Sequence, residues 1–285
     1  MGADALKGKT IVITGANSGI GLVAAASLAG MGGHIVLACR RQEAAEQAMR
    51  EIRQSCANAS LEFVPLDLAS LDSVRSAAQQ INMRHDRIDV LINNAGIANV
   101  RREQSEDGFE MTFAVNHLGP FLLTNLLLPS LKLGRGRIIN VASGAHKAGK
   151  MHWQDLQLQK RYFVITAYAQ SKLANILFTR ALAKRCAGMS IHVNCLHPGG
   201  VATNIWPDGN WFQRCFSALL KRFLITPEEG ARTTIWLASG EAGGRATGKY
   251  FVRCRERAPS SAASDDAAAE KLWALSEQLT GLTSR

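Results

Sequence analysis

The sequence predicts a single α/β domain: a doubly wound parallel sheet with helices on both faces. Short apolar runs rich in β-branched residues alternate with longer helical patterns along the chain. Near-continuous apolar strands separated by helices are typical of parallel sheets that are covered on both sides. The chain has 285 residues, 47% of them hydrophobic, and is long enough to bury a sizeable core. We therefore expect one domain over residues 1–285.

The first predicted unit is a strand, a glycine-rich turn and a helix. Residues 10–14 are β-branched, Gly15-Ala-Asn-Ser-Gly-Ile-Gly21 follows at once, and a helical pattern runs over residues 22–30. This order presents backbone N–H groups and a helix N-terminus to a phosphate. The first glycine can form the tight turn, the second admits a pyrophosphate, and the third lets helix and strand touch. The alternative is an ordinary glycine-rich connection.

The remaining elements follow in alternation. Further strands are predicted at residues 34–39, 61–66, 88–93, 137–141, 191–196 and 250–252. Helices are predicted at residues 43–55, 70–83, 109–131 (more than one helix), 167–186 and 268–279. Thr226-Pro-Glu-Glu marks another helix start, because proline suits the first helical position and carboxylates suit the first turn. Residues 253–267 are polar and Ala/Ser-rich, which predicts a surface excursion before the last helix.

Tyr168 and Lys172 lie four residues apart in a predicted helix, on the same face, with roughly 5–6 Å between their Cβ atoms. An ammonium beside a phenol favours the phenolate, so we expect Lys172 to lower the pKa of Tyr168 toward the range of an acid–base catalyst. Ser143 adds a hydroxyl at the C-terminal tip of the strand predicted at residues 137–141. Together they predict a device that moves a proton onto or off a substrate oxygen. The alternative is a solvated helix face.

Several motifs then occur together, in one order: Thr14-Gly-Ala-Asn-Ser-Gly-Ile-Gly21, Asn93-Asn-Ala-Gly96, Asn116, Ser143, Tyr168-x-x-x-Lys172 and His197-Pro-Gly199. On these motifs the chain resembles the short-chain dehydrogenase/reductase family over nearly its whole length. The resemblance implies a Rossmann-type fold and reversible hydride transfer between a nicotinamide and a carbonyl carbon. It further implies that Tyr168 exchanges the proton, Ser143 binds the substrate oxygen and Asn116 anchors a water that links Lys172 to solvent. The alternative for Asn116 is a helix-kink or turn residue.

A finer resemblance is to the retinol dehydrogenase-like branch of that family. It is carried by Val36-Leu-Ala-Cys-Arg40, Asn116-His-Leu-Gly-Pro-Phe-Leu-Leu-Thr124, Ser171-Lys-Leu-Ala-Asn175 and Gly248-Lys-Tyr-Phe251. The 25-residue separation of Ser143 and Tyr168 also matches that branch. Retinol dehydrogenases of this type usually begin with a hydrophobic anchor, whereas here the glycine motif starts almost at once.

The resemblance also implies cofactor contacts. Asp67 resembles the aspartate that pairs with the adenine amino group, with a helix N-cap as the alternative, although Ser70 is the better cap. Asn93 and the turn Ala95-Gly96 resemble the wall along the adenosine. The full predicted set is Gly15, Asn17, Ser18, Gly19, Ile20, Gly21, Arg40, Arg41, Asp67, Leu68, Asn94, Ala95, Gly96, Tyr168, Lys172, Pro198, Gly199, Val201 and Thr203.

Arg40 and Arg41 indicate which dinucleotide is used. NAD-preferring relatives carry an acidic residue near the end of the second strand, where it accepts the ribose 2′-OH. Here that strand ends in Ala38-Cys39-Arg40, so the acceptor is absent and a guanidinium, a good phosphate partner, is present. We therefore expect NADP(H). The alternative is that the arginines form a solvated helix start.

The substrate is predicted from residues 200–226, the expected lid. If helical, this segment has a broad apolar face of Trp211, Phe212, Cys215, Phe216, Leu219, Leu220, Phe223 and Leu224. Such a face suits a hydrophobic substrate such as a retinoid, or shallow membrane contact. The alternative is a face that packs on the core or on a second subunit. Met151, His152 and Trp153 are candidates for the opposite wall.

Composition excludes several classes. The net charge is +10, but the basic residues are dispersed without an aromatic-interleaved stripe, so a nucleic-acid partner is not expected. The six cysteines are scattered and have no Cys-x-x-Cys spacing, which predicts reduced thiols, no disulfide framework and no metal site. No run of 18 apolar residues or secretory signal is visible, so we expect a cytoplasmic protein. Peripheral membrane contact and a homodimer remain open.

Three functions remain in view at this stage. The first is an NADP(H)-dependent oxidoreductase acting on a retinal/retinol-type substrate. The second is a reductase of another hydrophobic carbonyl, such as a steroid, fatty aldehyde or quinone. The third is a non-catalytic, cofactor-binding regulatory protein, which the intact Ser143, Tyr168 and Lys172 disfavour.

Overall fold

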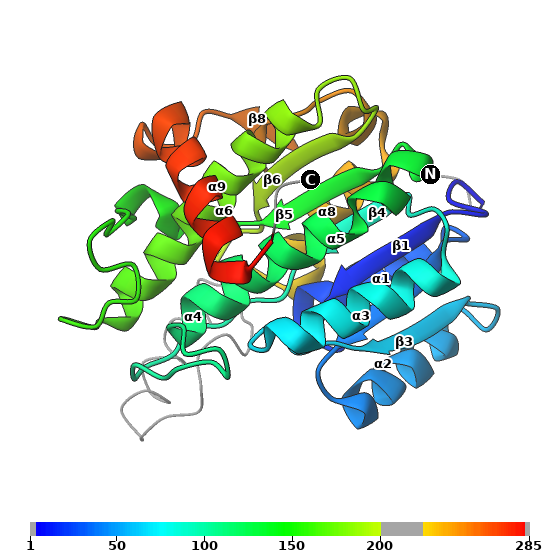
Figure 1. The fold of residues 1–285 in the computed structure, drawn as a ribbon. Coiled ribbons are helices and arrows are strands. Elements are labelled where there is room, and N and C mark those ends of the chain that lie inside the picture. The colour runs from blue at the N-terminus through cyan, green and yellow to red at the C-terminus, as the bar shows by residue number, and fades with distance from the viewer. Residues whose placement is uncertain (1–3, 201–224, 283–285) are drawn as a thin grey trace.

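Eight strands form one sheet in a computed structural model that describes residues 4–200 and 225–282 (Figure 1). Their spatial order is β3-β2-β1-β4-β5-β6-β7-β8, and all neighbours are parallel except β7 and β8. The strands are β1 (Thr10–Thr14), β2 (His34–Cys39), β3 (Leu61–Pro65), β4 (Val90–Asn93), β5 (Arg137–Val141), β6 (His192–His197), β7 (Tyr250–Val252) and β8 (Arg255–Arg257). The order reverses between β1 and β4, where ligands bind in doubly wound sheets.

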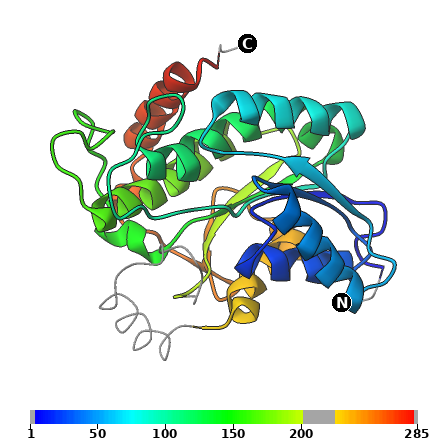
Figure 2. The ribbon, with the colours of Figure 1, turned by 90° about the horizontal axis from the view of Figure 1, so that it is seen from below.

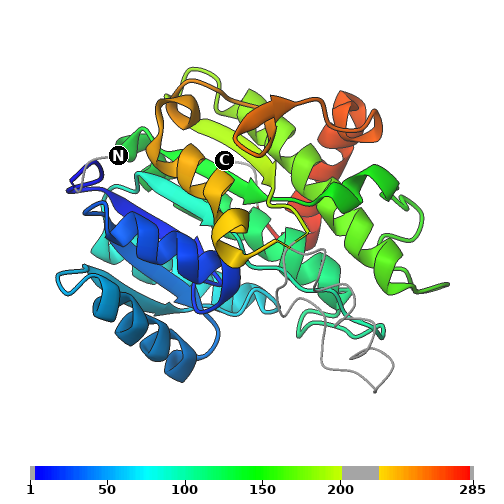
Figure 3. The same cartoon turned by 180° about the vertical axis from the view of Figure 1, so that it is seen from behind.

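Helices cover both faces of this sheet. One face carries α3 (Leu71–Arg84), α5 (Gly119–Gly134), α6 (Val164–Arg185) and α9 (Asp266–Thr280). The other face carries α1 (Gly19–Ala29), α2 (Gln42–Ser55) and α8 (Pro227–Ser239), as Figures 2 and 3 show. The predicted doubly wound α/β fold is confirmed.

The pleat of the strands divides the core between these two layers. On β1, Val12 packs with the α3, α5 and α6 side, whereas Ile11 and Ile13 pack with the α1 side. Alternate side chains of a strand point to opposite faces, so a strand buried on both faces must be apolar at every position. This explains the continuous apolar runs in the sequence.

The polar edge of the sheet departs from the prediction. Residues 253–267 are expected to be a surface excursion, but Arg255–Arg257 forms β8, antiparallel to β7. All three residues of β8 are exposed. An edge strand with charged side chains has no apolar pattern, which is why the sequence did not reveal it.

The helical region predicted at residues 109–131 is divided, as expected. It consists of α4 (Met111–Phe113), a π-helical turn at Ala114–Leu118 and α5. By length and composition alone, Met111–Gly134 could cross a membrane, because an 18-residue stretch of it has a mean hydropathy of 1.3. However, 72% of that stretch is buried inside the fold, as in the core helix of a globular protein.

Candidate active site

A pocket of about 720 Å³ opens at the carboxyl ends of β1, β2, β3, β4, β5 and β6. This volume falls within the range of small-molecule and cofactor sites, about 300–1,000 Å³. Of the predicted residues, those that line it are Gly15, Asn17, Ser18, Gly19, Ile20, Gly21, Arg40, Arg41, Asp67, Leu68, Asn94, Ala95, Gly96, Tyr168, Lys172 and Pro198. The fold therefore gathers predicted residues that are up to 183 positions apart, from Gly15 to Pro198, around one cavity.

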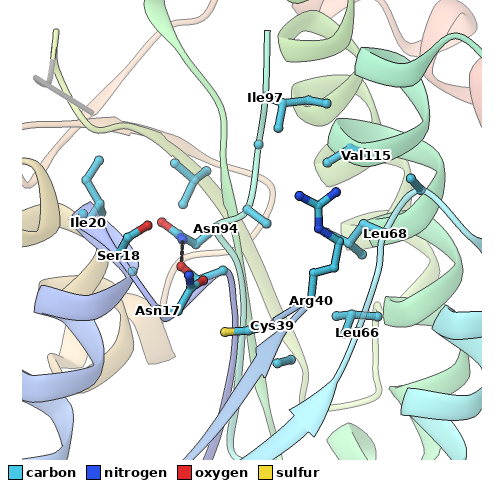
Figure 4. Close-up of a pocket in the computed structure, with 18 of the residues that line it drawn as sticks. Asn17, Ser18, Ile20, Cys39, Arg40, Leu66, Leu68, Asn94, Ile97 and Val115 are labelled. Atoms are coloured by element: carbon cyan, nitrogen blue, oxygen red, sulfur yellow. Dashed lines mark hydrogen bonds between the residues drawn. The ribbon is translucent and has the colours of Figure 1, made fainter. Parts of the chain in front are cut away.

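The glycine turn has no room for larger residues. Gly15 and Gly19 have φ values of 64° and 54°, in the left-handed region that favours glycine. A Cβ on Gly21 would lie 2.4 Å from the Gly15 carbonyl oxygen and 2.5 Å from Nδ2 of Asn94. That amide donates to the carbonyl oxygens of Thr14 (3.0 Å) and Gly15 (3.3 Å), and so braces the turn (Figure 4). The third glycine thus permits the close contact between helix and strand.

This turn meets the requirements of a phosphate cradle. Ser18 precedes α1 and makes no side-chain hydrogen bond that caps the helix. The first N–H groups of a helix have no partner within the helix and carry its positive dipole end, which together attract an anion. The residues present therefore fit the pyrophosphate of a dinucleotide.

Arg40 and Leu68 lie across the pocket from Asn17 and Ser18 (Figure 4). The Arg40 side chain is 70% exposed, and its guanidinium lies 4.0 Å from the Asp67 carboxylate. Oδ1 of Asp67 accepts a hydrogen bond from the backbone N–H of Ala69 at 2.9 Å. Ser70, not Asp67, is the N-cap of α3. Both charged groups are thus held at the pocket edge with capacity for further hydrogen bonds.

Tyr168 and Lys172 lie together on α6 and both line the pocket. Nζ of Lys172 donates to the carbonyl oxygen of Val141 at 3.0 Å. Only 3% of the lysine is exposed, and burial lowers its pKa to about 8. The Lys172 ammonium is therefore a buried cation next to the Tyr168 ring.

The prediction that the pKa of Tyr168 is lowered is wrong. Burial raises the pKa of Tyr168 above 10.0, and a hydrogen bond with Ser143 offsets only part of that rise. Desolvation disfavours the phenolate, while the Lys172 ammonium donates to Val141. In the folded chain the phenol is therefore held in its neutral, protonated form at neutral pH.

Ser143 is connected to this site by a hydrogen bond with Tyr168. It follows the end of β5, forms the N-cap of the short helix Gly144–Ala148, and its Oγ accepts from the Ala145 N–H at 3.2 Å. Its hydroxyl is hydrogen-bonded to Tyr168, although Ser143 is not among the described residues that line the pocket. The three side chains predicted to act together are in contact as a group.

Asn116 supports the pocket from behind. It lies in the π-helical turn, is 1% exposed, and does not line the pocket among the described residues. Its amide accepts from the Ile97 N–H (2.8 Å) and donates to the Ile97 carbonyl (2.9 Å) and to Ser171 Oγ (2.9 Å). Asn116 therefore joins the loop after β4 to α6, and its predicted role in anchoring a water that links Lys172 to solvent stays a prediction.

Other predicted residues lie elsewhere. Asn93 points into the core, where its Nδ2 donates to Thr124 and Asn140, because it is the last residue of β4 and faces the opposite side from Asn94. Gly199 is not in the pocket lining. Met151 is buried in the core and Trp153 packs against it, so neither forms a wall of this pocket. Val201, Thr203 and the lid residues at 201–224 lie outside the described residues.

Several further residues line the pocket without having been predicted, including Cys39, Leu66, Ile97, Val115 and Ala142. Cys39 and Leu66 end or follow β2 and β3, so the rule that ligands bind at strand ends could have identified them. Burial raises the pKa of Cys39 to about 11, which keeps this thiol unreactive. The five described cysteines, Cys39, Cys56, Cys186, Cys195 and Cys254, are free.

Known proteins are similar to this chain in sequence and in fold. A family model described as short chain dehydrogenase matches residues 9–211. Retinol dehydrogenase 13 from Homo sapiens is 44% identical, over 97% of this chain and 86% of that protein. Retinol dehydrogenase 14 from Homo sapiens is also 44% identical, over 97% of this chain and 88% of that protein.

Solved structures agree. The fold is similar to the crystal structure of an uncharacterised protein from Mycobacterium paratuberculosis, with a TM-score of 0.80 and 38% identity, over 96% of this chain and 94% of that one. It is also similar to a short chain dehydrogenase from Escherichia coli CFT073 in complex with NADPH, with a TM-score of 0.70 and 26% identity, over 90% and 100% of the two chains. The protein is therefore an oxidoreductase of the short-chain dehydrogenase/reductase family, in its retinol dehydrogenase-like branch.

Proposed function

We propose that this protein interconverts an apolar aldehyde or ketone and its alcohol with NADP(H), and that a retinoid is its substrate. The observation that carries the proposal is the shared pocket. Tyr168 and Lys172 line the same cavity as the glycine turn and Arg40. A bound nicotinamide would supply or accept the hydride at the substrate carbon.

The residues of this chain would handle the proton. In reduction, the protonated phenol of Tyr168 donates its proton to the oxygen of the substrate carbonyl. Ser143, already hydrogen-bonded to Tyr168, donates a hydrogen bond to that oxygen and stabilises the negative charge that develops there. The buried Lys172 ammonium favours the phenolate that remains after proton transfer. Asn116 holds the Ile97 backbone against α6 and so keeps the pocket wall in place.

Three observations support NADP(H). No acidic side chain ends β2, and the Arg40 guanidinium lines the pocket beside it. Arginine binds phosphate through several N–H donors at once, whereas the ribose hydroxyl of NAD needs an acceptor. The similar Escherichia coli enzyme was solved with NADPH.

The retinoid proposal rests on the relatives named retinol dehydrogenase 13 and 14. The test is to incubate purified protein with NADPH and, separately, all-trans-retinal, a steroid ketone, a long-chain aldehyde and a quinone, while following cofactor oxidation. We expect retinal to be reduced by the wild type and not by Tyr168→Phe. Turnover with another member of the panel alone would identify a different hydrophobic carbonyl. NADPH binding without turnover of any of them would indicate a regulatory protein.

A homodimer, a cytoplasmic location and peripheral membrane contact remain predictions. Light scattering of the purified protein tests the first. Co-sedimentation with phospholipid vesicles tests the last, and a protein that stays in the supernatant at low salt would contradict it.

A further inference from the structure

Three side chains converge far from the cofactor pocket: His34 at the start of β2, Glu62 in β3, and His85 just after α3. Nε2 of His34 lies 3.3 Å from Oε2 of Glu62, and Nε2 of His85 lies 2.8 Å from the same oxygen. One ligand atom from each residue can be chosen so that all three lie within 4.8 Å of one another. Within residues 4–200 and 225–282, no other group of three such side chains meets this criterion.

These separations suit a small transition-metal ion. Zinc binds imidazole nitrogen and carboxylate oxygen at about 2.0–2.2 Å in tetrahedral geometry, so neighbouring ligand atoms lie roughly 3.3–3.6 Å apart. The distances of 3.3 and 2.8 Å are close to that edge length. Small rotations of the side chains would complete the geometry, with water in the fourth position.

The residues around the cluster orient it. Nδ1 of His34 lies 2.7 Å from Oγ of Ser60. When that nitrogen donates to the serine, the lone pair is on Nε2, which faces Glu62, and such outer hydrogen bonds are typical of metal-binding histidines. Nη1 of Arg84 lies 2.6 Å from Oε1 of Glu62 and leaves Oε2 for the two imidazoles.

Solvent can reach this cluster. The side chains of His34, Glu62 and His85 are 29%, 20% and 14% exposed, so an ion could enter without unfolding. The Arg84 guanidinium beside Glu62 favours the ionised carboxylate, which is the form that binds a metal ion.

We propose that His34, Glu62 and His85 form a zinc-binding site that joins β2, β3 and the end of α3. The site is structural, because His34 and the pocket residue Cys39 are at opposite ends of β2. Five residue steps along a strand span about 17 Å. A zinc ion there would stabilise the β2–β3 edge of the sheet without contacting the cofactor.

Calorimetric titration of the tag-free, chelator-treated protein with Zn²⁺ at neutral pH tests the proposal. We expect one ion per chain and a higher Tm in its presence, because a ligand that binds only the folded state stabilises it. Loss of an outer-shell partner weakens metal binding about 10–100-fold, so His34→Gln or His85→Gln should weaken it by at least about 100-fold. Ser60→Ala should weaken it about 10-fold.

Two further variants control the experiment. Arg84→Gln removes a positive charge beside the ion while keeping an N–H donor for Glu62, so it should bind zinc more tightly than the wild type. His192→Gln, at the start of β6, should leave binding unchanged. If His34→Gln and His85→Gln do not fold, as judged by circular dichroism, Ser60→Ala and Arg84→Gln decide the outcome.

Titration with Co²⁺ distinguishes metal binding at this site from metal binding by cysteine thiols. Co²⁺ bound by imidazole and carboxylate lacks the intense near-ultraviolet charge-transfer band that thiolate ligands give. Cys56 and Cys254 are partly exposed and are the described thiols within reach of an added ion. The absence of saturable zinc binding, zinc binding that survives both histidine substitutions, or a thiolate band at one equivalent would each overturn the proposal.

Discussion

Nζ of Lys172 lies 5.6 Å from the centroid of the Tyr168 ring, one helical turn along α6. Residues four apart on a helix face the same side, so the backbone alone brings them together. Burial then favours the neutral form of both the phenol and the amine. It raises the pKa of Tyr168 and lowers that of Lys172 to about 8.

The pH dependence of the reaction follows from the raised pKa of Tyr168. Carbonyl reduction needs the protonated phenol, so its kcat/KM should be flat at neutral pH and fall as the pH rises through that pKa. Alcohol oxidation needs the phenolate, so its kcat/KM should rise with pH through the alkaline range. Profiles measured in both directions test this expectation, and an oxidation rate that peaks in acid would contradict it.

Removal of the phenol hydroxyl should stop the reaction and spare the cofactor. We expect Tyr168→Phe to lower kcat by at least about 10³-fold, within the range for loss of a general acid. Ser143→Ala, which removes a donor to the substrate oxygen, should lower kcat by about 10²–10³-fold. NADPH affinity, measured by fluorescence titration, serves as the control and should change by less than about 3-fold in both. A Tyr168→Phe enzyme of near-normal rate would refute the assignment.

Lys172 should make stability depend on pH. Burial lowers its pKa from 10.5 to about 8, so between these values the unfolded chain binds more protons than the folded one. The free energy of unfolding should therefore rise with pH across this window, by up to roughly 3 kcal/mol. Lys172→Met removes this contribution. Urea denaturation of both proteins from neutral pH to about pH 10 measures the difference, and parallel pH profiles would contradict the prediction.

A single methyl group should block the glycine turn. In Gly21→Ala the new Cβ would meet the Gly15 carbonyl oxygen and the Asn94 amide at 2.4 and 2.5 Å. Either the turn or α1 must move, so we expect loss of NADPH binding by at least about 10-fold and destabilisation of about 1–3 kcal/mol. Gly108→Ala is a useful contrast, because its Cβ meets no atom within 4 Å, although its φ of 81° still imposes strain. Gly108→Ala should therefore retain NADPH affinity.

Arg40 should decide between the two dinucleotides. Loss of a hydrogen bond to a charged group costs about 1.5–3 kcal/mol, so Arg40→Ala should weaken NADPH binding about 10–100-fold and leave NADH binding unchanged. Arg50→Ala is a matched control, because Arg50 lies on α2, bonds to Gln47 and is absent from the pocket lining. Equal NADPH affinity of Arg40→Ala and wild type would remove Arg40 from the site.

Patterns that are local in the sequence identified most of the fold. The strands β1, β2, β5 and β7 match their predicted ranges, because a strand buried on both faces needs a continuous apolar run. The strand β8 escaped prediction because its exposed Arg-Glu-Arg run gives no such signal. Asn93 and Asn94 show the limit at single residues: adjacent side chains of a strand point in opposite directions, and only the paired sheet decides which one faces the pocket.

The sequence by itself determined the doubly wound sheet, the glycine turn and the Tyr168–Lys172 pair, because each depends on residues within a few positions of one another. Only the tertiary structure decided how buried that pair is and, with it, the raised pKa of Tyr168. It alone also brought His34, Glu62 and His85 together, although His34 and His85 are 51 positions apart in the chain. Desolvation and long-range contact depend on how distant segments pack, and no short stretch of sequence records that packing.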